Sequence, residues 1–573
     1  MKNAANPILK VEGLTVDFLS DKEPVRAVDN VSFHVNRSET LVILGESGSG
    51  KSVSTSTVMD LLDCPPADIV AGACHFDGIE LSRLDAEARR SINGRRIAMI
   101  FQDPLAYLNP VYTVGRQIEE VYESHGAGKG RQARANAIEL LRRVGIPEPE
   151  SRVDFYPHQF SGGQRQRVMI AMAIALKPDI LIADEPTTAL DVSVQAQILE
   201  LLRDLQRETG MALIMITHDL EVASAMADRV IVMNAARVVE AGSAREVFSN
   251  PQHAYTRRLI SALPHGDAAE TSNKRSTGGA GDVLLKVEHL TKDYLLSSGS
   301  FAGKRTFKAV DDVSFEVRRG ETLGIVGESG SGKSSVARML LRLNDPSSGR
   351  ALFAGEDIFG MNGKRLMTFR RKVQMVFQDP YGSMNPRMNV HAIISEPWVI
   401  HRDILSKEKW KGRVSELLEL VGLRPEHADR YPHQFSGGQR QRIAIARALA
   451  SEPELIICDE AVSALDVSIQ AQVIDLLADL RTRLGLSYIF ITHDLPIVRH
   501  FADRIMVMKQ GKIVEEGDTS TVFSAPRHEY TQSLLRAVPR PKWLMQTEEP
   551  SAEPTIGADG LWSERPRNGS LAR

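Results

Sequence analysis

The octapeptide GESGSGKS occupies residues 45–52 and recurs letter for letter at residues 327–334. Both copies have the spacing Gly-x-x-x-x-Gly-Lys-Ser of a phosphate-binding loop. Each follows an apolar run that predicts a buried strand, and each opens a segment without Gly or Pro that can form a helix. Glycines let backbone N–H groups converge on phosphate oxygens, and the start of a helix adds partial positive charge. The chain is therefore predicted to bind a nucleotide at two places.

All residues of the two loops are candidate nucleotide contacts. Lys51 and Lys333 are expected to reach the β- and γ-phosphates, while the hydroxyls of Ser52 and Ser334 help to hold Mg²⁺. The candidates are Gly45, Glu46, Ser47, Gly48, Ser49, Gly50, Lys51 and Ser52 in the first loop, and Gly327, Glu328, Ser329, Gly330, Ser331, Gly332, Lys333 and Ser334 in the second.

Length and composition narrow the class of protein. A chain of 573 residues is too long for one core, so at least two domains are expected. With 70 Lys and Arg against 73 Asp and Glu, the net charge of −3 argues against a protein wrapped in nucleic acid. Cys64, Cys74 and Cys458 form no C-x-x-C pair, which predicts a reducing cytosol and no disulfide framework. No stretch resembles a signal peptide or the roughly 18 apolar residues of a membrane span, so any membrane role is expected to be peripheral.

The repeat extends well beyond the phosphate loops. FQDP at 101–104 returns at 377–380, YPHQFSGGQRQR at 156–167 returns unchanged at 431–442, and ITHD at 216–219 returns at 491–494. A few extra residues around Cys64 to Cys74 in the first half suit a surface loop. The chain is therefore predicted to be two copies of one domain. The expected boundaries are residues 1–263 for the first domain, 264–282 for a flexible linker, 283–539 for the second domain and 540–573 for a disordered tail.

Each half reads as an α/β domain. Alternating apolar segments at 14–18 and 27–35, and again at 290–294 and 309–317, predict antiparallel strands. The last part of each half alternates helices with buried strands, which predicts a mostly parallel sheet. Between these parts lies a mainly helical stretch, expected to form a separate lobe.

Two pairs of adjacent carboxylates, Asp184-Glu185 and Asp459-Glu460, each end a strongly apolar strand. At the carboxyl edge of a parallel sheet beside a phosphate loop, this is where a Mg²⁺ and a water activator are expected. We therefore assign Asp184 and Asp459 to the Mg²⁺ shell, and Glu185 and Glu460 as general bases. The alternative is a helix start carrying acidic residues for its dipole.

Histidines end another apolar strand in each half. His218 and His493 lie within the repeated ITHD. A lone histidine at such a place is usually structural, but its repetition favours a contact with the γ-phosphate.

The order of these motifs resembles the nucleotide-binding domain of ATP-binding cassette (ABC) proteins, once in each half. The resemblance covers roughly residues 8–262 and 284–539 and includes the glutamines Gln102 and Gln378 and the highly specific SGGQ signatures. It implies two tandem P-loop NTPase domains. Each would have a RecA-like, mostly parallel sheet core, an antiparallel β subdomain and a helical subdomain that carries the signature.

The family pairs its domains head to tail with two ATP molecules sandwiched between them. Ser436, Gly437, Gly438 and Gln439 would then face the nucleotide held by Lys51, and Ser161, Gly162, Gly163 and Gln164 the one held by Lys333. The resemblance also places Gln102 and Gln378 beside the metal. Two competent ATPase sites are expected, because Gln, Glu, His and signature are present in both halves.

The resemblance also suggests a residue that stacks on adenine. Phe18 and Tyr294 sit where the family keeps an aromatic side chain for this contact. As isolated residues they would more often belong to the core beneath a strand, and the sequence leaves both readings open.

Several sequence segments resemble those of the ABC proteins that energise importers of dipeptides, oligopeptides, glutathione-like peptides and nickel. These are the YPHQFSGGQRQR segment and the endings HAYT at 253–256 and HEYT at 528–531. This resemblance implies two separate transmembrane permeases, a solute-binding protein, a peripheral place on the cytoplasmic face of the inner membrane, and no nucleic-acid partner. The alternatives are a soluble twin-cassette ATPase acting on ribosomes or DNA, and, less favoured still, an exporter ATPase.

The segments after Gln102 and Gln378 would hold the groove for a permease helix. Apolar residues there could equally be the core of the helical lobe, and the sequence does not choose between the two. They are Leu105, Tyr107, Leu108, Tyr381 and Met384.

Overall fold

The computed structural model describes residues 7–19, 23–188, 190–261, 281–296, 305–463, 465–539 and 541–542. Most of the predicted linker and of the predicted tail lies outside these residues, as do Ala189 and Ala464. Among the described residues, no helix is both long enough and apolar enough to cross a membrane.

Each half contains a six-stranded sheet that is parallel apart from its last pair. The order is β10-β9-β3-β8-β7-β6 in the first half and β16-β17-β18-β13-β19-β20 in the second, and only β9–β10 and β19–β20 are antiparallel. The strands of the first sheet are β3 (Thr40–Leu44), β6 (Ile97–Ile100), β7 (Ile180–Asp184), β8 (Ala212–Thr217), β9 (Arg229–Asn234) and β10 (Arg237–Ser243). Those of the second are β13 (Thr322–Val326), β16 (Val373–Val376), β17 (Leu455–Asp459), β18 (Ser487–Ile491), β19 (Arg504–Lys509) and β20 (Lys512–Asp518).

A four-stranded antiparallel sheet covers one face of each six-stranded sheet. Its order is β2-β1-β4-β5 in the first half and β12-β11-β14-β15 in the second. The strands are β1 (Leu9–Phe18), β2 (Val25–Val35), β4 (Ala67–Phe76) and β5 (Ile79–Glu80), then β11 (Val283–Leu296), β12 (Arg305–Arg318), β14 (Ser348–Phe353) and β15 (Glu356–Asp357).

Helices cover the other face and build a lobe between β6 and β7, and between β16 and β17. The helices of the first half are α1 (Lys51–Val58), α2 (Ala86–Ile92), α3 (Pro104–Tyr107), α4 (Val114–Ser124), α5 (Arg131–Arg143), α6 (Pro149–Arg152), α7 (Gly162–Ile174), α8 (Val192–Thr209), α9 (Leu220–Met226), α10 (Ala244–Ser249) and α11 (Ala254–Ser261). Those of the second half are α13 (Lys333–Leu340), α14 (Gly363–Lys372), α15 (Val390–Ile400), α16 (Trp410–Leu420), α17 (Gly437–Leu449), α18 (Val467–Leu484), α19 (Leu495–Phe501), α20 (Thr519–Ser524) and α21 (Glu529–Ala537).

The strand sequences explain why the parallel sheet is the middle layer. In β3, Leu41 and Ile43 pack toward the antiparallel sheet, while Val42 and Leu44 pack toward the helices. Because successive side chains of a strand point to opposite faces, a strand buried on both faces is apolar throughout. The second half repeats this alternation in β17, where Ile457 and Cys458 belong to different cores.

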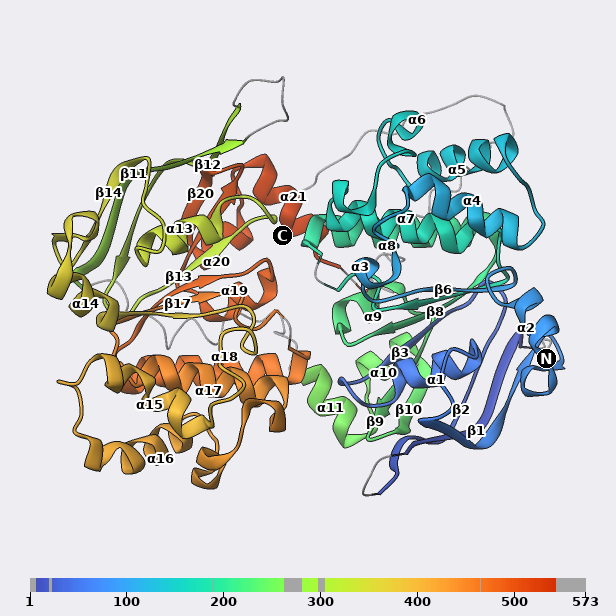
Figure 1. The fold of residues 1–573 in the computed structure, drawn as a ribbon, viewed down its shortest axis with the longest axis horizontal. Coiled ribbons are helices and arrows are strands. Elements are labelled where there is room, and N and C mark those ends of the chain that lie inside the picture. The colour runs from blue at the N-terminus through green and yellow to red at the C-terminus, as the bar shows by residue number, and fades with distance from the viewer. Residues whose placement is uncertain are drawn as a thin grey trace, which may run out of the picture.

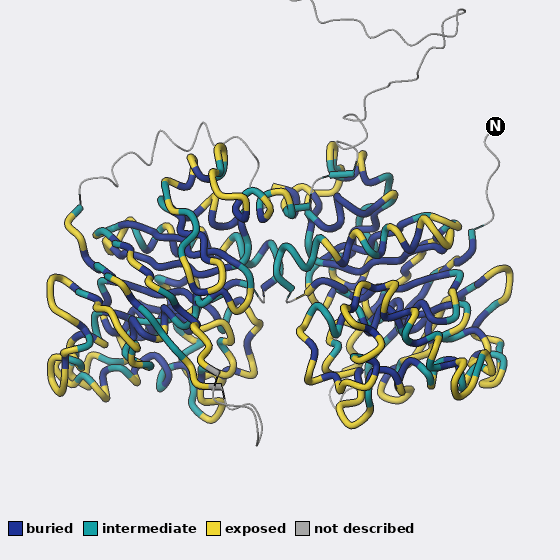
Figure 2. The backbone as a smooth tube through the Cα atoms, turned by 90° about the horizontal axis from the view of Figure 1, so that it is seen from above, coloured by how far each residue is buried: buried dark blue, intermediate teal, exposed yellow. Residues whose placement is uncertain are grey.

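The two halves lie side by side and point in opposite directions. In Figure 1 the lobe with α4, α5 and α6 lies at the top of the first half, and that with α15 and α16 at the bottom of the second. Buried segments fill the interior of each half, and partly exposed ones meet where the halves adjoin (Figure 2). The predicted α/β fold, repeated in the two halves, is confirmed.

The surface loop predicted around residues 64–74 is wrong for most of its length. Residues 67–76 form β4, which pairs antiparallel with β1. Cys74 is a residue of this strand, and its side chain is buried. The extra residues mainly lengthen this strand, which has 10 residues where β14 has 6. Half of β4 is exposed and its alternation is irregular, so its hydrophobic pattern gave little signal.

Candidate functional site

Each phosphate loop joins a central strand to a helix. The loops connect β3 to α1 and β13 to α13, as the sequence predicted. The Nζ of Lys51 donates to the carbonyl oxygens of Gly45 at 2.7 Å and Glu46 at 2.8 Å, and Lys333 repeats both contacts in its own loop. Burial lowers the pKa of both lysines. The loops therefore hold a buried ammonium group at the start of a helix, which suits a phosphate ligand.

A serine and an aspartate meet beside each loop. The Ser52 hydroxyl donates to Asp184 Oδ1 at 3.0 Å, and Ser334 donates to Asp459 at the same distance. Burial raises the pKa of both aspartates, and the serine bond opposes that rise. A hydroxyl with one carboxylate suits Mg²⁺, which completes its shell with phosphate oxygens and water. Among the described residues, no group of three or more His, Cys, Asp or Glu side chains is placed to hold a metal ion.

The predicted base of the first site is held by three side chains. Gln102 Nε2 donates to Glu185 Oε2 at 2.7 Å, and Thr188 Oγ1 donates to the same oxygen at 2.9 Å. His218 Nδ1 lies 3.0 Å from Glu185 Oε1. The sequence placed Gln102, Glu185 and His218 in one site, and the structure brings them together. It did not single out Thr188.

The second site repeats two of these three contacts. Gln378 Nε2 donates to Glu460 Oε2 at 2.7 Å, and His493 Nδ1 lies 3.7 Å from Glu460 Oε1. Ser463, the counterpart of Thr188, donates to the backbone oxygen of Glu460 instead. The two sites therefore contain the same kinds of groups but hold their glutamates differently.

The glutamate–histidine pairs shift both pKa values. Burial alone would raise the pKa of Glu185, but the bond and charge of His218 outweigh it and leave that pKa below 4.5. The contact with His493 lowers the pKa of Glu460 in the same way. Burial lowers the pKa of both histidines, but the neighbouring glutamate raises it by more. The pKa of each histidine is therefore above 6.5. Both shifts favour the ionic form of each pair.

Replacing both histidines by glutamine (H218Q with H493Q) is expected to lower the Tm in a pH-dependent way. The glutamate part of the stabilisation is present above pH 4.5, and the histidine part is fully present below pH 6.5. The difference from the wild type, on the order of 1 kcal/mol per pair, should be largest between these values. It should shrink as the pH rises through the raised histidine pKa. Calorimetry at pH 5.5 and 8.5 measures it, and an equal difference at both pH values would contradict the ionic pairs.

Each signature begins a helix. Ser161 caps α7, where its Oγ accepts from Gln164 N at 3.3 Å and its own N–H donates to Gln164 Oε1 at 3.2 Å. Ser436 and Gln439 form the same box at the start of α17. Both serines are exposed. The cap leaves an exposed helix start with a small side chain, which can meet an anion.

The halves touch through their phosphate loops. Ser47 N donates to Asp466 Oδ1 of the other half at 3.0 Å, and Ser329 N donates to Asp191 Oδ1 at 2.6 Å. Asp191 and Asp466 were not among the predicted site residues. Their contacts link each phosphate loop directly to the opposite half.

The carboxylates of the loop glutamates also point across the junction. Glu46 accepts a hydrogen bond from Ser468 Oγ, and Glu328 Oε1 accepts one from Ser193 Oγ at 2.6 Å. Both serines lie in the first turn of a helix of the opposite half, α18 and α8. Glu46 and Glu328, predicted as nucleotide contacts, therefore use their side chains to join the halves.

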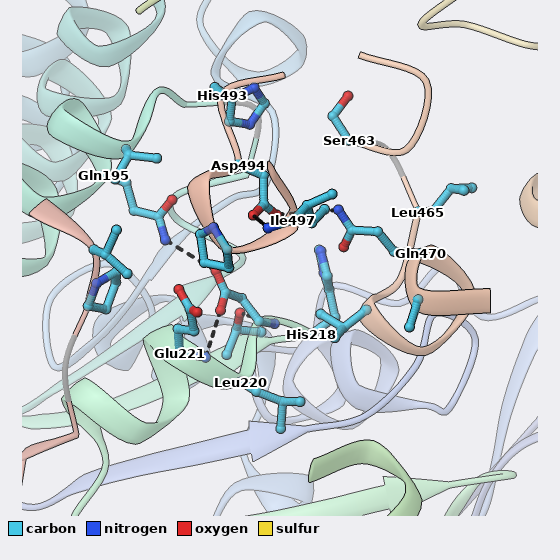
Figure 3. A pocket seen from close by; sticks show the side chains of 18 of the residues that line it. Gln195, His218, Leu220, Glu221, Ser463, Leu465, Gln470, His493, Asp494 and Ile497 are labelled. Atoms are coloured by element: carbon cyan, nitrogen blue, oxygen red, sulfur yellow. Dashed lines mark hydrogen bonds between the residues drawn. The ribbon is translucent and has the colours of Figure 1, made fainter. Parts of the chain in front are cut away.

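A cavity of about 430 Å³ lies between the halves, lined from both sides. Figure 3 shows His218 and Glu221 of the first half and Ser463, His493 and Asp494 of the second around it. Burial, with help from Asp219 and Asp494, raises the pKa of Glu221 to about 8. Glu221 is therefore mostly protonated at pH 7, unlike the glutamates of the two sites.

The predicted adenine contacts lie in the antiparallel sheets. Phe18 ends β1 and packs partly into the core below it. Tyr294 lies in β11 and is more exposed, and its hydroxyl accepts from Asn344 at 3.3 Å. Core packing thus accounts for part of the Phe18 surface, and the stacking role of both residues stays a prediction.

Comparison with known proteins agrees with this geometry. A family model described as ABC transporter matches residues 28–188 and 310–463. A second, described as oligopeptide/dipeptide transporter, C-terminal region, matches residues 239–284 and 514–557. The peptidoglycan transport ATP-binding protein YejF of Agrobacterium fabrum is 47% identical over 93% of this chain and 96% of its own length. The glutathione import ATP-binding protein GsiA of Shigella boydii is 46% identical over 93% of this chain and 90% of its own. The chain belongs to the ABC transporter family and is an ATPase with two cassettes in one polypeptide.

Proposed function

We propose that the chain hydrolyses ATP to energise the import of peptides or peptide-like solutes through two separate membrane permeases. The observation that carries this proposal is the nearly full-length similarity to proteins named for glutathione import and peptidoglycan transport. The match of both halves to the oligopeptide/dipeptide C-terminal region supports the same solute class. A solute-binding protein would deliver the cargo, and the chain would work as a peripheral subunit on the cytoplasmic face of the inner membrane.

Two ATP molecules would lie between the halves. The contacts of Asp466 with the first loop and of Asp191 with the second support a head-to-tail pair, in which each signature faces the opposite loop. The serine hydroxyl and glycine N–H groups of a signature would then meet the γ-phosphate only when the halves close.

The remaining site residues divide the chemistry of hydrolysis. Glu185 and Glu460 would take the proton of the attacking water, and His218 and His493 would orient those carboxylates and contact the γ-phosphate. Ser52, Asp184 and Gln102, with their counterparts Ser334, Asp459 and Gln378, would hold Mg²⁺, which supplies charge stabilisation on the phosphate oxygens when bound.

We place the docking surfaces for the permeases in the segments that follow Gln102 and Gln378. In the first half, Leu105, Tyr107 and Val111 are exposed by 58%, 58% and 72%, while Leu108 is buried in the lobe core. Tyr107 stacks on Phe101 with 3.9 Å between ring centroids. Leu108 therefore belongs to the core of the lobe, whereas the side chains of Leu105 and Tyr107 are exposed and available for a permease groove. Exposed apolar side chains held rigidly in one place suit a docking helix.

The second half offers a similar but not identical surface. Tyr381 is 46% exposed and lies under the guanidinium of Arg440, 5.0 Å from its ring centroid, while Met384 is buried. Arg440 belongs to the signature helix α17. A permease that presses on Tyr381 would therefore contact a side chain coupled to the ATP-facing helix.

Purification of the tagged chain from detergent-solubilised membranes tests the importer proposal. Mass spectrometry is expected to find two multi-span, permease-like proteins. Recovery of ribosomal proteins or nucleic acid without an integral membrane partner would overturn the proposal.

Two charged substitutions should then release the permease on the first half. Tyr107→Asp with Val111→Asp is expected to reduce co-purification of at least one permease more than tenfold, because two desolvated carboxylates each cost several kcal/mol in an apolar interface. The ATPase rate of the purified chain should stay within about twofold, since neither residue is among the predicted site residues. The control is Val70→Asp, on the exposed strand β4 far along the chain from this surface. Equal loss of permeases in the control and the test variant would contradict this docking surface.

A further inference from the structure

The repeated HAYT and HEYT motifs start the last helix of each half, α11 and α21. The Nδ1 of His253 accepts from Tyr255 N at 3.2 Å, and that of His528 accepts from Tyr530 N at 3.1 Å. The carboxylate of Glu240 accepts from the backbone N–H of His253 at 3.0 Å and fixes this turn to β10. Glu515 does the same from β20. The position of each tyrosine is therefore set by its own C-terminal region.

Both tyrosines reach the phosphate loop of their own half. The Tyr255 hydroxyl accepts from Glu46 N at 3.3 Å, and the Tyr530 hydroxyl accepts from Glu328 N at 3.2 Å. The two residues are only 4% and 6% exposed. Because the same contact forms in both halves, we take it to be a feature of the repeated domain.

The same loop glutamates carry the contacts to the opposite half. Glu46 binds the tyrosine through its backbone and Ser468 of the other half through its carboxylate. The next residue, Ser47, donates to Asp466. One dipeptide of the phosphate loop thus lies between its own C-terminal helix and the opposing half.

The C-terminal helices also contact the opposite half directly. Helix α21 packs against α8, and α11 packs against α18, so each helix lies at the junction (Figure 1). The serines Ser193 and Ser468 begin these partner helices. At each site, the phosphate loop therefore lies beside the C-terminal helix of its own half and a helix of the opposite half. We call this set of contacts the loop junction.

We infer that Tyr255 and Tyr530 are positioning residues for nucleotide binding, which fix the phosphate loop in the conformation that the serine and aspartate of the opposite half engage. The region matched as oligopeptide/dipeptide C-terminal region then takes part in closing the ATP sites. This inference rests on the proposed role of the loops in binding ATP.

The test is the full chain with Tyr255→Phe and Tyr530→Phe, which keep the rings and remove the hydroxyls. The KM for ATP and the Kd of a non-hydrolysable ATP analogue are expected to rise roughly three- to tenfold, because a partly buried loop N–H loses its acceptor. The kcat should stay within about twofold, since no reacting group is removed. The control is Tyr488→Phe, because the buried Tyr488 hydroxyl has no hydrogen-bond partner among the described residues. An unchanged KM and Kd in the test variant would overturn the inference.

A double-mutant cycle tests the link between the halves. Tyr255→Phe and Ser468→Ala should weaken analogue binding by less together than the product of their separate effects, because both act through Glu46. Independent, multiplicative effects would contradict the claim that Tyr255 and Ser468 act through the same residue. Lys51→Ala with Lys333→Ala distinguishes an error in the ATP sites from an error in the role of the tyrosines. If these lysine variants bind the analogue normally, the ATP sites themselves are misassigned. If they lose binding while the tyrosine variants match Tyr488→Phe, only the tyrosine role is wrong.

Discussion

Glu185→Gln combined with Glu460→Gln is expected to abolish ATP turnover while ATP binding remains. Removing a positioned general base costs roughly 10² to 10⁴-fold in rate. The phosphate contacts assigned to Lys51 and Lys333 are untouched, so binding should persist. The amide is isosteric with the carboxylate and still offers an oxygen to Gln102 and Thr188, so the local structure should survive. The measurements are phosphate release and the Kd of ATP.

The double variant should also trap the closed pair. Hydrolysis would remove the γ-phosphate that bridges a loop to the opposite signature, and without it the halves should stay together. A distance measurement between labels on the two halves, with ATP and after its removal, follows this closure. Substantial remaining hydrolysis would mean that the base assignment is wrong.

Glu221→Gln is the matched control for this variant. It is the same substitution, in the cavity between the halves, at a carboxyl group that burial keeps mostly protonated at pH 7. Replacing a neutral acid by a neutral amide of equal size should leave turnover within about twofold. A comparable loss in the control would indicate that any change at this junction stops the enzyme.

The single variants address the difference between the two sites. Glu185 accepts hydrogen bonds from Gln102 and Thr188, whereas Glu460 accepts only that of Gln378 from the equivalent pair. A carboxylate with more donors is a weaker base but is held more firmly. If the sites work independently, Glu185→Gln and Glu460→Gln should leave different residual rates.

The sequence predicted most of this architecture because the informative residues are local. The loop octapeptide, the apolar strands around it and the repeated order of motifs require no knowledge of tertiary contacts. Alternation in β1 and continuous apolar character in β3 separated the two kinds of sheet correctly. β4 lacks both signals, because a run of five exposed residues interrupts its alternation.

What the sequence could not supply is the set of contacts across the junction. Glu46 and Ser468 are 422 residues apart in the chain, and nothing in either local pattern names the other. Thr188 was missed for a different reason. Its hydroxyl donates to the carboxylate of Glu185, whereas the hydroxyl of Ser463 donates to the backbone oxygen of Glu460, and the two sequences do not show this difference. The repeated HAYT and HEYT endings marked a family branch, and only the fold placed their tyrosines against the phosphate loops.

Gly50→Ala and Gly332→Ala are each expected to damage a phosphate loop severely. Both glycines have left-handed backbone conformations, with φ of 95° and 104°. A Cβ at Gly50 would lie 2.3 Å from the carbonyl oxygen of Ala27, and one at Gly332 would lie 2.4 Å from that of Ala309. These oxygens belong to the backbone of β2 and β12, so the clash cannot be relieved by a side-chain rotation.

The expected result of Gly50→Ala is a combined loss of stability and of ATP binding. Backbone strain of about 1–3 kcal/mol adds to the displacement of the strand. A loop shifted by even 1 Å relative to the phosphates can lose roughly 10²-fold in function. Thermal unfolding without nucleotide and the Kd of ATP measure the two effects separately.

Gly48→Ala separates strain from the clash within the same loop. Gly48 also has a positive φ, 76°, but a Cβ there would meet no heavy atom within 4 Å among the described residues. It should therefore lose only about 1–2 kcal/mol, the cost of the left-handed conformation for a residue with a Cβ. If Gly48→Ala and Gly50→Ala are equally damaging, the close approach of β2 to the loop is not what requires glycine at position 50. If Gly50→Ala alone loses ATP binding, the antiparallel sheet sets the shape of the phosphate loop, since the obstructing oxygen belongs to that sheet.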